Sequence, residues 1–126
     1  MRRILHTEDA PAAVGAYSQG VETEDLVFTA GQIPLTPEGD LLDGASIDVQ
    51  TEQALENVEA VLADAGASMD DVVKVTVFME DIDDFEEMNA VYETFFDEEN
   101  PPARSAIGVD ELPKGVGVEV EAVATK

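Results

Sequence analysis

The segment Val72–Met79 limits the possible folds of this chain more than any other, because it is apolar on both of its alternating faces. It reads VVKVTVFM and is dominated by β-branched residues, which favour a strand. Successive side chains of a strand point to opposite sides of the sheet, so Val73 and Val75 are expected on one side and Val72 and Phe78 on the other. A sheet that contains this strand must therefore be covered on both sides.

Two amphipathic helices are predicted, one before this strand and one after it. The first has an N-cap at Ser46 and a stop at Gly66, and its apolar residues recur at steps of three and four: Ile47, Ala54, Leu55, Val58, Val61, Leu62 and Ala65. The second is capped by Asp81 or Asp83 and ends before Asn100-Pro101-Pro102. Its apolar face comprises Ile82, Phe85, Met88, Tyr92, Phe95 and Phe96.

Three further strands are expected, at residues 24–33, 104–109 and 117–124, with a loop at 34–44 and a turn at 113–115. The order of strands, helix, strand, helix and strands predicts one α+β domain over residues 1–126. Two helices cover only one face of a sheet, so we expect other subunits to bury the second face. The sequence thus predicts a homo-oligomer.

The chain is strongly acidic. It carries 29 Asp plus Glu against 6 Lys plus Arg, a formal net charge of −23. The acidic residues are scattered rather than gathered in a tail, and in about 1 M salt the Debye length is only about 3 Å, which screens their mutual repulsion. We interpret the acidity as an adaptation to a salt-rich cytoplasm rather than as a sign of a basic partner.

Several kinds of site and segment have no counterpart in the sequence. There is no apolar run of membrane-spanning length, and the start, MRRILHTEDAP, does not have the pattern of a signal peptide, so we expect a cytoplasmic protein. The chain has no cysteine, which excludes disulfides and thiolate sites. No HExxH, GxGxxG, GxxxxGK[ST] or CxxC motif is present, so we expect no metal and no cofactor.

Arg104 is the residue best suited to bind an anion. The other two arginines lie within the first three positions, so Arg104 is expected to be the sole guanidinium in the folded body. It follows Pro101-Pro102 and shares a strand face with Ala106 and Gly108, whose small side chains leave room above the sheet. A guanidinium beside such room suits a carboxylate, through two parallel hydrogen bonds. Composition alone favours another role, an ion pair with one of the many acidic side chains.

Four other residues are candidates for a site. Glu119 alternates with valines, which is typical of a solvated strand face, but in a cleft between subunits it becomes a candidate proton acceptor or water-positioning group. Tyr17 lies in a loop of small residues, where it either closes a pocket wall or packs its ring. Gly31 interrupts a strand, which marks a bulge or a ligand close to the backbone. Asn89 falls on the buried side of the second helix, where its amide requires a partner.

Seven groups of residues, taken together, carry a family resemblance over nearly the entire chain. They are Ala10-Pro11-Ala12-Ala13 with Tyr17-Ser18-Gln19-Gly20, Ala30-Gly31-Gln32-Ile33-Pro34, Asn57-Val58, residues 73–78, Asn89 with Tyr92-Glu93-Phe95-Phe96, Pro102-Ala103-Arg104-Ser105, and Glu119-Val120-Glu121-Ala122. In their order and spacing they resemble the reactive intermediate deaminase family (RidA, YjgF).

The resemblance implies a chorismate-mutase-like fold, a mixed β-sheet packed on two α-helices, assembled as a homotrimer with ligand sites between subunits. It also implies hydrolysis of 2-imino or enamine acids, such as 2-iminopropionate and 2-iminobutyrate, to 2-keto acids and ammonia without a cofactor. By this likeness Arg104 binds the substrate carboxylate and Glu119 handles water or the reacting nitrogen. Tyr17, Gly31 and Asn89 line or support the cleft.

The sequence departs from the family pattern at two positions of the implied cleft. Many members have serine where Ala30 stands and cysteine where Ala106 stands, so a hydroxyl contact and a reactive thiol are missing here. A protonated C=N bond is already electrophilic, and water attacks it without a covalent enzyme intermediate. Imine hydrolysis therefore requires neither group, but the substrate preference is open.

Two other functions remain open from the sequence. Some relatives have been described as ribonucleases or translation inhibitors, but a net charge of −23 with six basic residues offers no basic stripe for phosphates. The second alternative is a non-catalytic module whose clefts hold a keto acid or another metabolite. As partners we expect a small 2-imino or 2-keto acid and further copies of the chain, with neither nucleic acid nor membrane.

Overall fold

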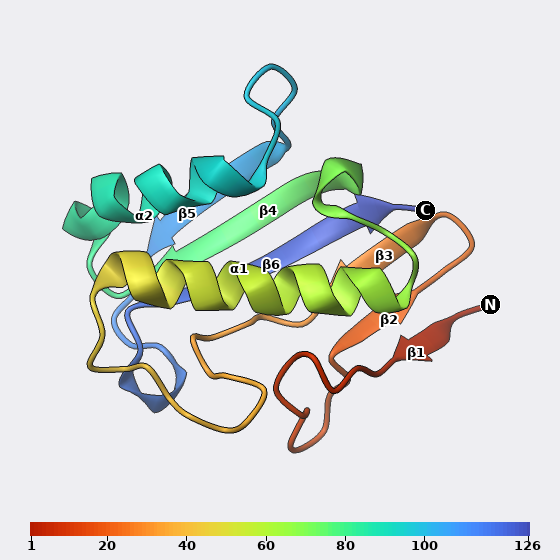
Figure 1. Cartoon of the computed structure of the whole chain (residues 1–126), viewed down its shortest axis with the longest axis horizontal. Coiled ribbons are helices and arrows are strands. Elements are labelled where there is room, and N and C mark those ends of the chain that lie inside the picture. Colours follow the sequence, from red (N-terminus) through yellow and green to blue (C-terminus); the bar gives the residue numbers. More distant parts are fainter.

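The computed structural model describes residues 1–126 and contains a six-stranded sheet and two α-helices (Figure 1). The strands are β1 (Arg3–Leu5), β2 (Gly20–Glu22), β3 (Leu26–Thr29), β4 (Val72–Met79), β5 (Ala103–Gly108) and β6 (Val118–Thr125). The helices are α1 (Ile47–Asp64) and α2 (Phe85–Tyr92), and neither is long and apolar enough to cross a membrane. The predicted α+β fold with two helices is confirmed.

The sheet is mixed, with the strand order β1-β2-β3-β6-β4-β5. Only β4 and β5 are parallel, and every other pair of neighbours is antiparallel. Parallel neighbours need a crossover connection, which α2 supplies between β4 and β5. β5 is last in the strand order and is therefore an edge strand.

Both helices lie on the same face of the sheet (Figure 1). α1 packs on β6 and β3 and against α2. The core between the helices and the sheet contains fully buried side chains such as Leu55 and Leu62 of α1, Val77 of β4 and Val120 of β6. The three- and four-residue spacing in α1 follows from this packing, since only one side of the helix meets the sheet.

The ends of the helices follow the predicted residues in part. Gly66 comes just after α1 with φ +76°, a backbone conformation that glycine adopts without strain. Ser46 has the extended backbone of an N-cap, but its hydroxyl bonds the side chain of Asp48 instead of a backbone N–H. Asp81 accepts a hydrogen bond from the Asp83 N–H and begins the second helical segment, as predicted.

The opposite face of the sheet has no helix over it. Pairing of the strands places three rows of side chains across this open face: Ile4, Val21, Phe28, Val123 and Lys74; Glu121, Thr76 and Ser105; and Glu119, Phe78 and Ile107. Phe28 and Ile107 are 41% and 43% exposed, so a single chain leaves apolar groups of this face in water. Its burial by other subunits stays a prediction.

The prediction for the two faces of β4 is wrong at its first residues. A register shift between Val72 and Lys74 places Val72 on the core side, together with Val75, and leaves Val73 44% exposed. A bulge of this kind inserts one residue and reverses the alternation of the strand before it. From Lys74 onward the alternation is regular.

Two element boundaries also differ from the prediction. The strand expected at residues 24–33 spans only Leu26–Thr29. Beyond it, the Ala30 N–H still bonds Gln19 O, and Gln32 forms an isolated bridge with Val120. The helix expected from Asp81 to just before Asn100 begins as a 3-10 turn at Ile82–Asp84, and its α-helical part ends at Tyr92, where a second 3-10 turn follows at Glu93–Phe95. Ile82, which was expected on the apolar face of this helix, is 47% exposed.

Glu22 of β2 binds cations from both ends of the chain. Its buried carboxylate accepts a hydrogen bond from Arg3 Nε of β1 and lies 2.8 Å from Lys126 Nζ. Arg3 Nη2 also donates to Asp64 O at the end of α1, at 2.9 Å. The prediction that Arg104 is the sole guanidinium in the fold is therefore wrong. Hydrogen bonds from Lys126 and Arg3 hold the pKa of Glu22 below its usual value.

We expect Glu22→Gln to lower the melting temperature at pH 7, because two cations lose their shared charged acceptor. A carboxyl whose folded pKa is depressed stabilises the protein above its ordinary pKa of about 4.3, and this stabilisation is lost as the pH falls through the folded value. Thermal unfolding of both proteins at neutral and acid pH checks this. The difference in melting temperature should shrink on acidification, and a constant difference would contradict an ionic role for Glu22.

Candidate functional site

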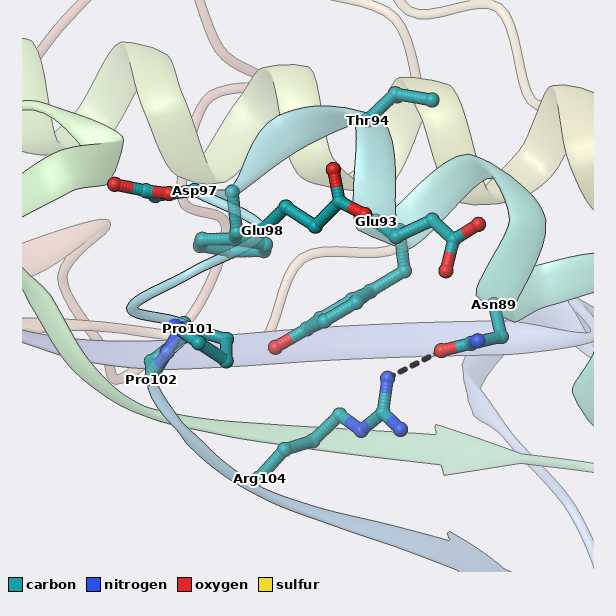
Figure 2. A pocket seen from close by; sticks show the side chains of 10 residues that line it. Asn89, Glu93, Thr94, Asp97, Glu98, Pro101, Pro102 and Arg104 are labelled. Carbon is teal, nitrogen blue, oxygen red and sulfur yellow. Dashed lines mark hydrogen bonds between the residues drawn. The ribbon is translucent and has the colours of Figure 1, made fainter.

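Arg104 lies on the edge strand β5, directly after the Pro101-Pro102 segment. In the parallel ladder it stands beside Val75, a core residue, so its side chain points to the helix face of the sheet. Figure 2 shows the side chain extending beneath α2 toward Asn89. Arg104 Nη1 donates a hydrogen bond of 2.6 Å to Asn89 Oδ1. Arg104 is thus the hydrogen-bonding partner that was expected for the Asn89 amide.

Two aromatic rings flank the guanidinium of Arg104. Its Cζ lies 4.5 Å from the ring centroid of Tyr92 and 5.2 Å from that of Phe85, distances at which a cation is attracted to a ring face. Burial raises the pKa of the Tyr92 hydroxyl, while the charge of Arg104 opposes this effect. The guanidinium forms no other hydrogen bond within the chain, so its remaining N–H donors are available to a ligand.

A cavity of about 630 Å³ opens beside Arg104. This volume lies within the range of small-molecule sites, about 300–1,000 Å³. Arg104 is the only cation among the residues around the cavity, whose walls also include Asn89, Tyr92, Phe96, Pro101 and Pro102, with Glu93, Asp97 and Glu98 at the exposed rim (Figure 2). An anionic ligand in this cavity is therefore drawn to Arg104.

Ala106 belongs to the same side of the sheet as Arg104. It lies two residues further along β5, opposite Val77 in the ladder, and is half-buried. A Cβ atom at Gly108 would lie 3.4 Å from Ile82 Cβ, so this face of β5 runs beneath the start of the second helical segment. The predicted shared face of Arg104, Ala106 and Gly108 is confirmed.

Glu119 and Gly31 form a second group, on the open face. Glu119 pairs across the ladder with Phe78, and its carboxylate lies against the backbone of Gly31. A Cβ atom at Gly31 would be 2.5 Å from Glu119 Oε2, which explains the glycine at this position. The Gly31 N–H forms no hydrogen bond within the chain. Burial raises the pKa of Glu119, and the charge of Glu121 adds to the rise.

Tyr17 lies near this second group. It is 55% exposed and lines a shallow hollow together with Ala30 and Phe28 of the open face. The hydroxyl of Tyr17 has no hydrogen bond in the chain, and its ring is not packed in the core. Of the two interpretations of this tyrosine, the structure supports the exposed pocket wall.

The predicted site residues thus fall into two groups on opposite faces of the sheet. Arg104, Asn89 and Ala106 belong to the helix face at the β5 edge, whereas Glu119, Gly31 and Tyr17 belong to the open face. β4 separates β5 from β6. One chain therefore does not bring Arg104 and Glu119 onto the same small ligand.

The two groups offer complementary chemistry. The free guanidinium donors of Arg104 suit a carboxylate. A carboxylate whose pKa is raised, such as that of Glu119, is a stronger base than an ordinary carboxylate and therefore a better proton acceptor. No three His, Cys, Asp or Glu side chains are arranged to hold a metal ion.

The sequence pattern assigned Phe85 and Tyr92 to the core and missed their contact with Arg104. A usable signal was present, because Phe85, Asn89 and Tyr92 follow one another at steps of four and three and so share one side of α2. The polar member of this stripe, Asn89, required a hydrogen-bonding partner. What the sequence did not supply was the identity of the strand beneath it.

Comparison with known proteins connects this architecture to one family. The sequence profile of the family described as endoribonuclease L-PSP matches residues 7–126. A RutC family protein of Pyrococcus abyssi is 47% identical over 126 residues, 99% of this chain and 98% of that protein. The 2-iminobutanoate/2-iminopropanoate deaminase of Salmonella typhimurium is 45% identical over 100% of this chain and 99% of its own. The crystal structure of Escherichia coli TdcF with bound serine has a TM-score of 0.92, at 44% identity and 98% coverage of both chains.

We expect Glu119→Gln to raise the melting temperature at pH 7. A carboxyl with a raised folded pKa contributes stability that is present below its ordinary pKa of about 4.3 and is lost as the pH rises through the folded value. The ionised carboxylate is therefore unfavourable at pH 7, and the gain from glutamine should vanish at acid pH. Glu80→Gln, a change of an exposed carboxylate after β4, is the control. An equal gain in both variants would contradict the specific burial of Glu119.

Proposed function

The chain belongs to the endoribonuclease L-PSP family, and from this premise we propose that it hydrolyses short 2-imino acids to 2-keto acids and ammonia. The proposed substrates are 2-iminopropionate and 2-iminobutyrate. The observation that carries the proposal is the free Arg104 guanidinium, held by Asn89 beside a cavity of small-molecule size. Relatives that are 45% and 44% identical are named as deaminases of these two imines.

The proposal assigns the substrate carboxylate to Arg104. Its planar fork binds a carboxylate by two parallel hydrogen bonds, and the Asn89 contact fixes its orientation before the ligand arrives. A solved relative holds serine, which also carries a carboxylate on a short chain. Short 2-imino acids have the same group next to the reacting carbon, so binding at Arg104 positions that carbon.

A complete site in this proposal requires two copies of the chain. Arg104 and Glu119 lie on opposite faces of one sheet, so a ligand held by Arg104 of one copy meets Glu119, Gly31 and Tyr17 of another. The exposed Phe28 and Ile107 give the open face the apolar surface that such an interface needs. A closed ring of three copies is the assembly we propose.

The chemistry follows from these positions. Arg104 and the free Gly31 N–H bind the carboxylate, and Glu119 accepts a proton from a water that attacks C2 of the imine. The product of attack is a carbinolamine. Glu119 then returns this proton to the nitrogen and accepts the proton of the carbinolamine hydroxyl as the C–N bond breaks and the C=O bond forms. The products are a 2-keto acid and ammonia. These steps use neither the cysteine thiol that many family members have in place of Ala106 nor the serine hydroxyl that they have in place of Ala30.

We do not propose ribonuclease activity, although the family is described as endoribonuclease L-PSP. Binding a phosphate backbone requires several unpaired cations. Of six basic residues, Arg3 and Lys126 bind Glu22, and Lys74 Nζ donates to Ser105 Oγ at 2.9 Å. The other three basic residues, Arg2, Arg104 and Lys114, are too few to form a basic surface for phosphates on a chain with a net charge of −23.

Arg104→Ala is expected to abolish the acceleration of imine hydrolysis, because the carboxylate loses its cation. The imines are generated in place by an amino-acid oxidase in high-salt buffer, and release of keto acid or ammonia is followed. Lys114→Asn, which removes a positive charge from an exposed turn with φ +58°, is the matched control and should retain full activity. A wild type that adds nothing to the spontaneous rate would overturn the deaminase proposal.

Mixing two inactive variants tests whether the site spans two copies. Arg104→Ala and Glu119→Gln, unfolded and refolded together, should regain activity, because some interfaces then combine an intact Arg104 with an intact Glu119. Arg104→Ala refolded with Asn89→Ala is the control. Arg104 and Asn89 belong to the same copy, so no interface in this mixture contains an intact Arg104–Asn89 pair. Activity that fails to rise in the first mixture contradicts a shared site.

A further inference from the structure

The hydroxyl of Tyr92 is the one buried side-chain polar group in the chain without a hydrogen-bond partner. Tyr92 is 5% exposed, and its ring packs against Phe96 at 4.7 Å between centroids. Leaving a buried hydroxyl unpaired is costly, and proteins rarely do so. The hydroxyl therefore has no hydrogen-bond partner within a single chain.

The position of Tyr92 indicates what can serve as its partner. Its ring covers the Arg104 guanidinium with 4.5 Å between Cζ and the centroid, and it forms part of the wall of the 630 Å³ cavity. A hydroxyl beside a fixed cation turns its oxygen toward the charge and its hydrogen away from it. That hydrogen is then offered to an acceptor in the cavity, and an anion that Arg104 attracts supplies one.

We propose that the Tyr92 hydroxyl donates a hydrogen bond to the carboxylate held by Arg104, so that the two residues bind this group together. The proposal rests on the proposed function, since it takes the ligand to be a short 2-imino or 2-keto acid. Tyr92 becomes a substrate-binding residue rather than core filling. Asn89 and the Tyr92 ring orient the guanidinium, and the Tyr92 hydroxyl binds the ligand directly.

Tyr92→Phe removes the hydroxyl and keeps the ring. The ring contacts with Arg104 and Phe96 remain, and the loss of an unpaired buried polar group should leave the melting temperature equal or higher. Affinity for 2-oxobutyrate, measured by calorimetry in high-salt buffer, should fall about tenfold, the effect of losing one hydrogen bond to a charged group. A variant that is as stable as the wild type but binds more weakly supports the proposal.

Thr94→Val is the matched control for removing a hydroxyl near the cavity. Thr94 Oγ1 already donates to Val91 O at 2.6 Å, and Figure 2 shows its side chain pointing away from Arg104. Binding of 2-oxobutyrate by this variant should equal that of the wild type. An equal loss in both variants would overturn the specific role of Tyr92.

A second measurement reports on the hydroxyl itself. The chain has two tyrosines and no tryptophan, so protein labelled with ¹³C at tyrosine Cζ gives two signals, and the one absent from Tyr92→Phe is that of Tyr92. This signal should shift on addition of 2-oxobutyrate but not of 2-butanone, which lacks the carboxylate. No shift with 2-oxobutyrate would overturn the proposal.

The outcomes distinguish this inference from the proposed function. If Tyr92→Phe binds 2-oxobutyrate within about twofold of the wild type, a difference too small for a lost hydrogen bond, the role of Tyr92 fails while imine hydrolysis stands. If the wild type binds 2-oxobutyrate with Tyr92 involved but does not accelerate imine hydrolysis, the deaminase proposal fails alone. Absence of binding by the wild type overturns the role of Tyr92, and the rate of imine hydrolysis then decides the deaminase proposal separately.

Discussion

Successive side chains of a β-strand point to opposite faces of the sheet, and this alternation organises the whole molecule. In β6 it sends Val118 and Val120 into the core and Glu119 to the open face. In β5 it turns Arg104 toward α2. Helices cover only one face of the sheet, so Arg104 lies on the covered face and Glu119 on the open face. The proposed chemistry then depends on a second copy that brings the two faces together.

The environment of Arg104 is set before any ligand binds. Its guanidinium is held by the Asn89 side chain and lies between two rings of α2. Its strand lies at the edge of the sheet, where a ligand or a second copy has access. Preorganisation of this kind reduces the ordering cost of binding, so a small ligand with few atoms is held more tightly.

Much of the fold could be predicted from the sequence, because α1 and most of β4 have strong periodic patterns. The open face of the sheet and the facing of Arg104 with Ala106 followed from alternation alone. β1 and β2 could not be predicted, since Arg3–Leu5 and Gly20–Glu22 are short and depend on a pairing that only the folded chain supplies. The placement of Arg104 and Glu119 on opposite faces of the sheet could not be predicted for a related reason. Periodicity gives the faces of one strand but not which faces of distant strands coincide.

Glu22 has a consequence for the connectivity of the chain. Its carboxylate binds Arg3 near the first residue and Lys126 at the last, and both ends lie at the same side of the molecule (Figure 1). Chains whose termini are close together tolerate circular permutation. A short linker could therefore join the two ends, and new ends could be opened in the exposed loop at residues 37–40. The order of the elements along the chain would change while the contacts at Arg104 and Glu119 stayed in place.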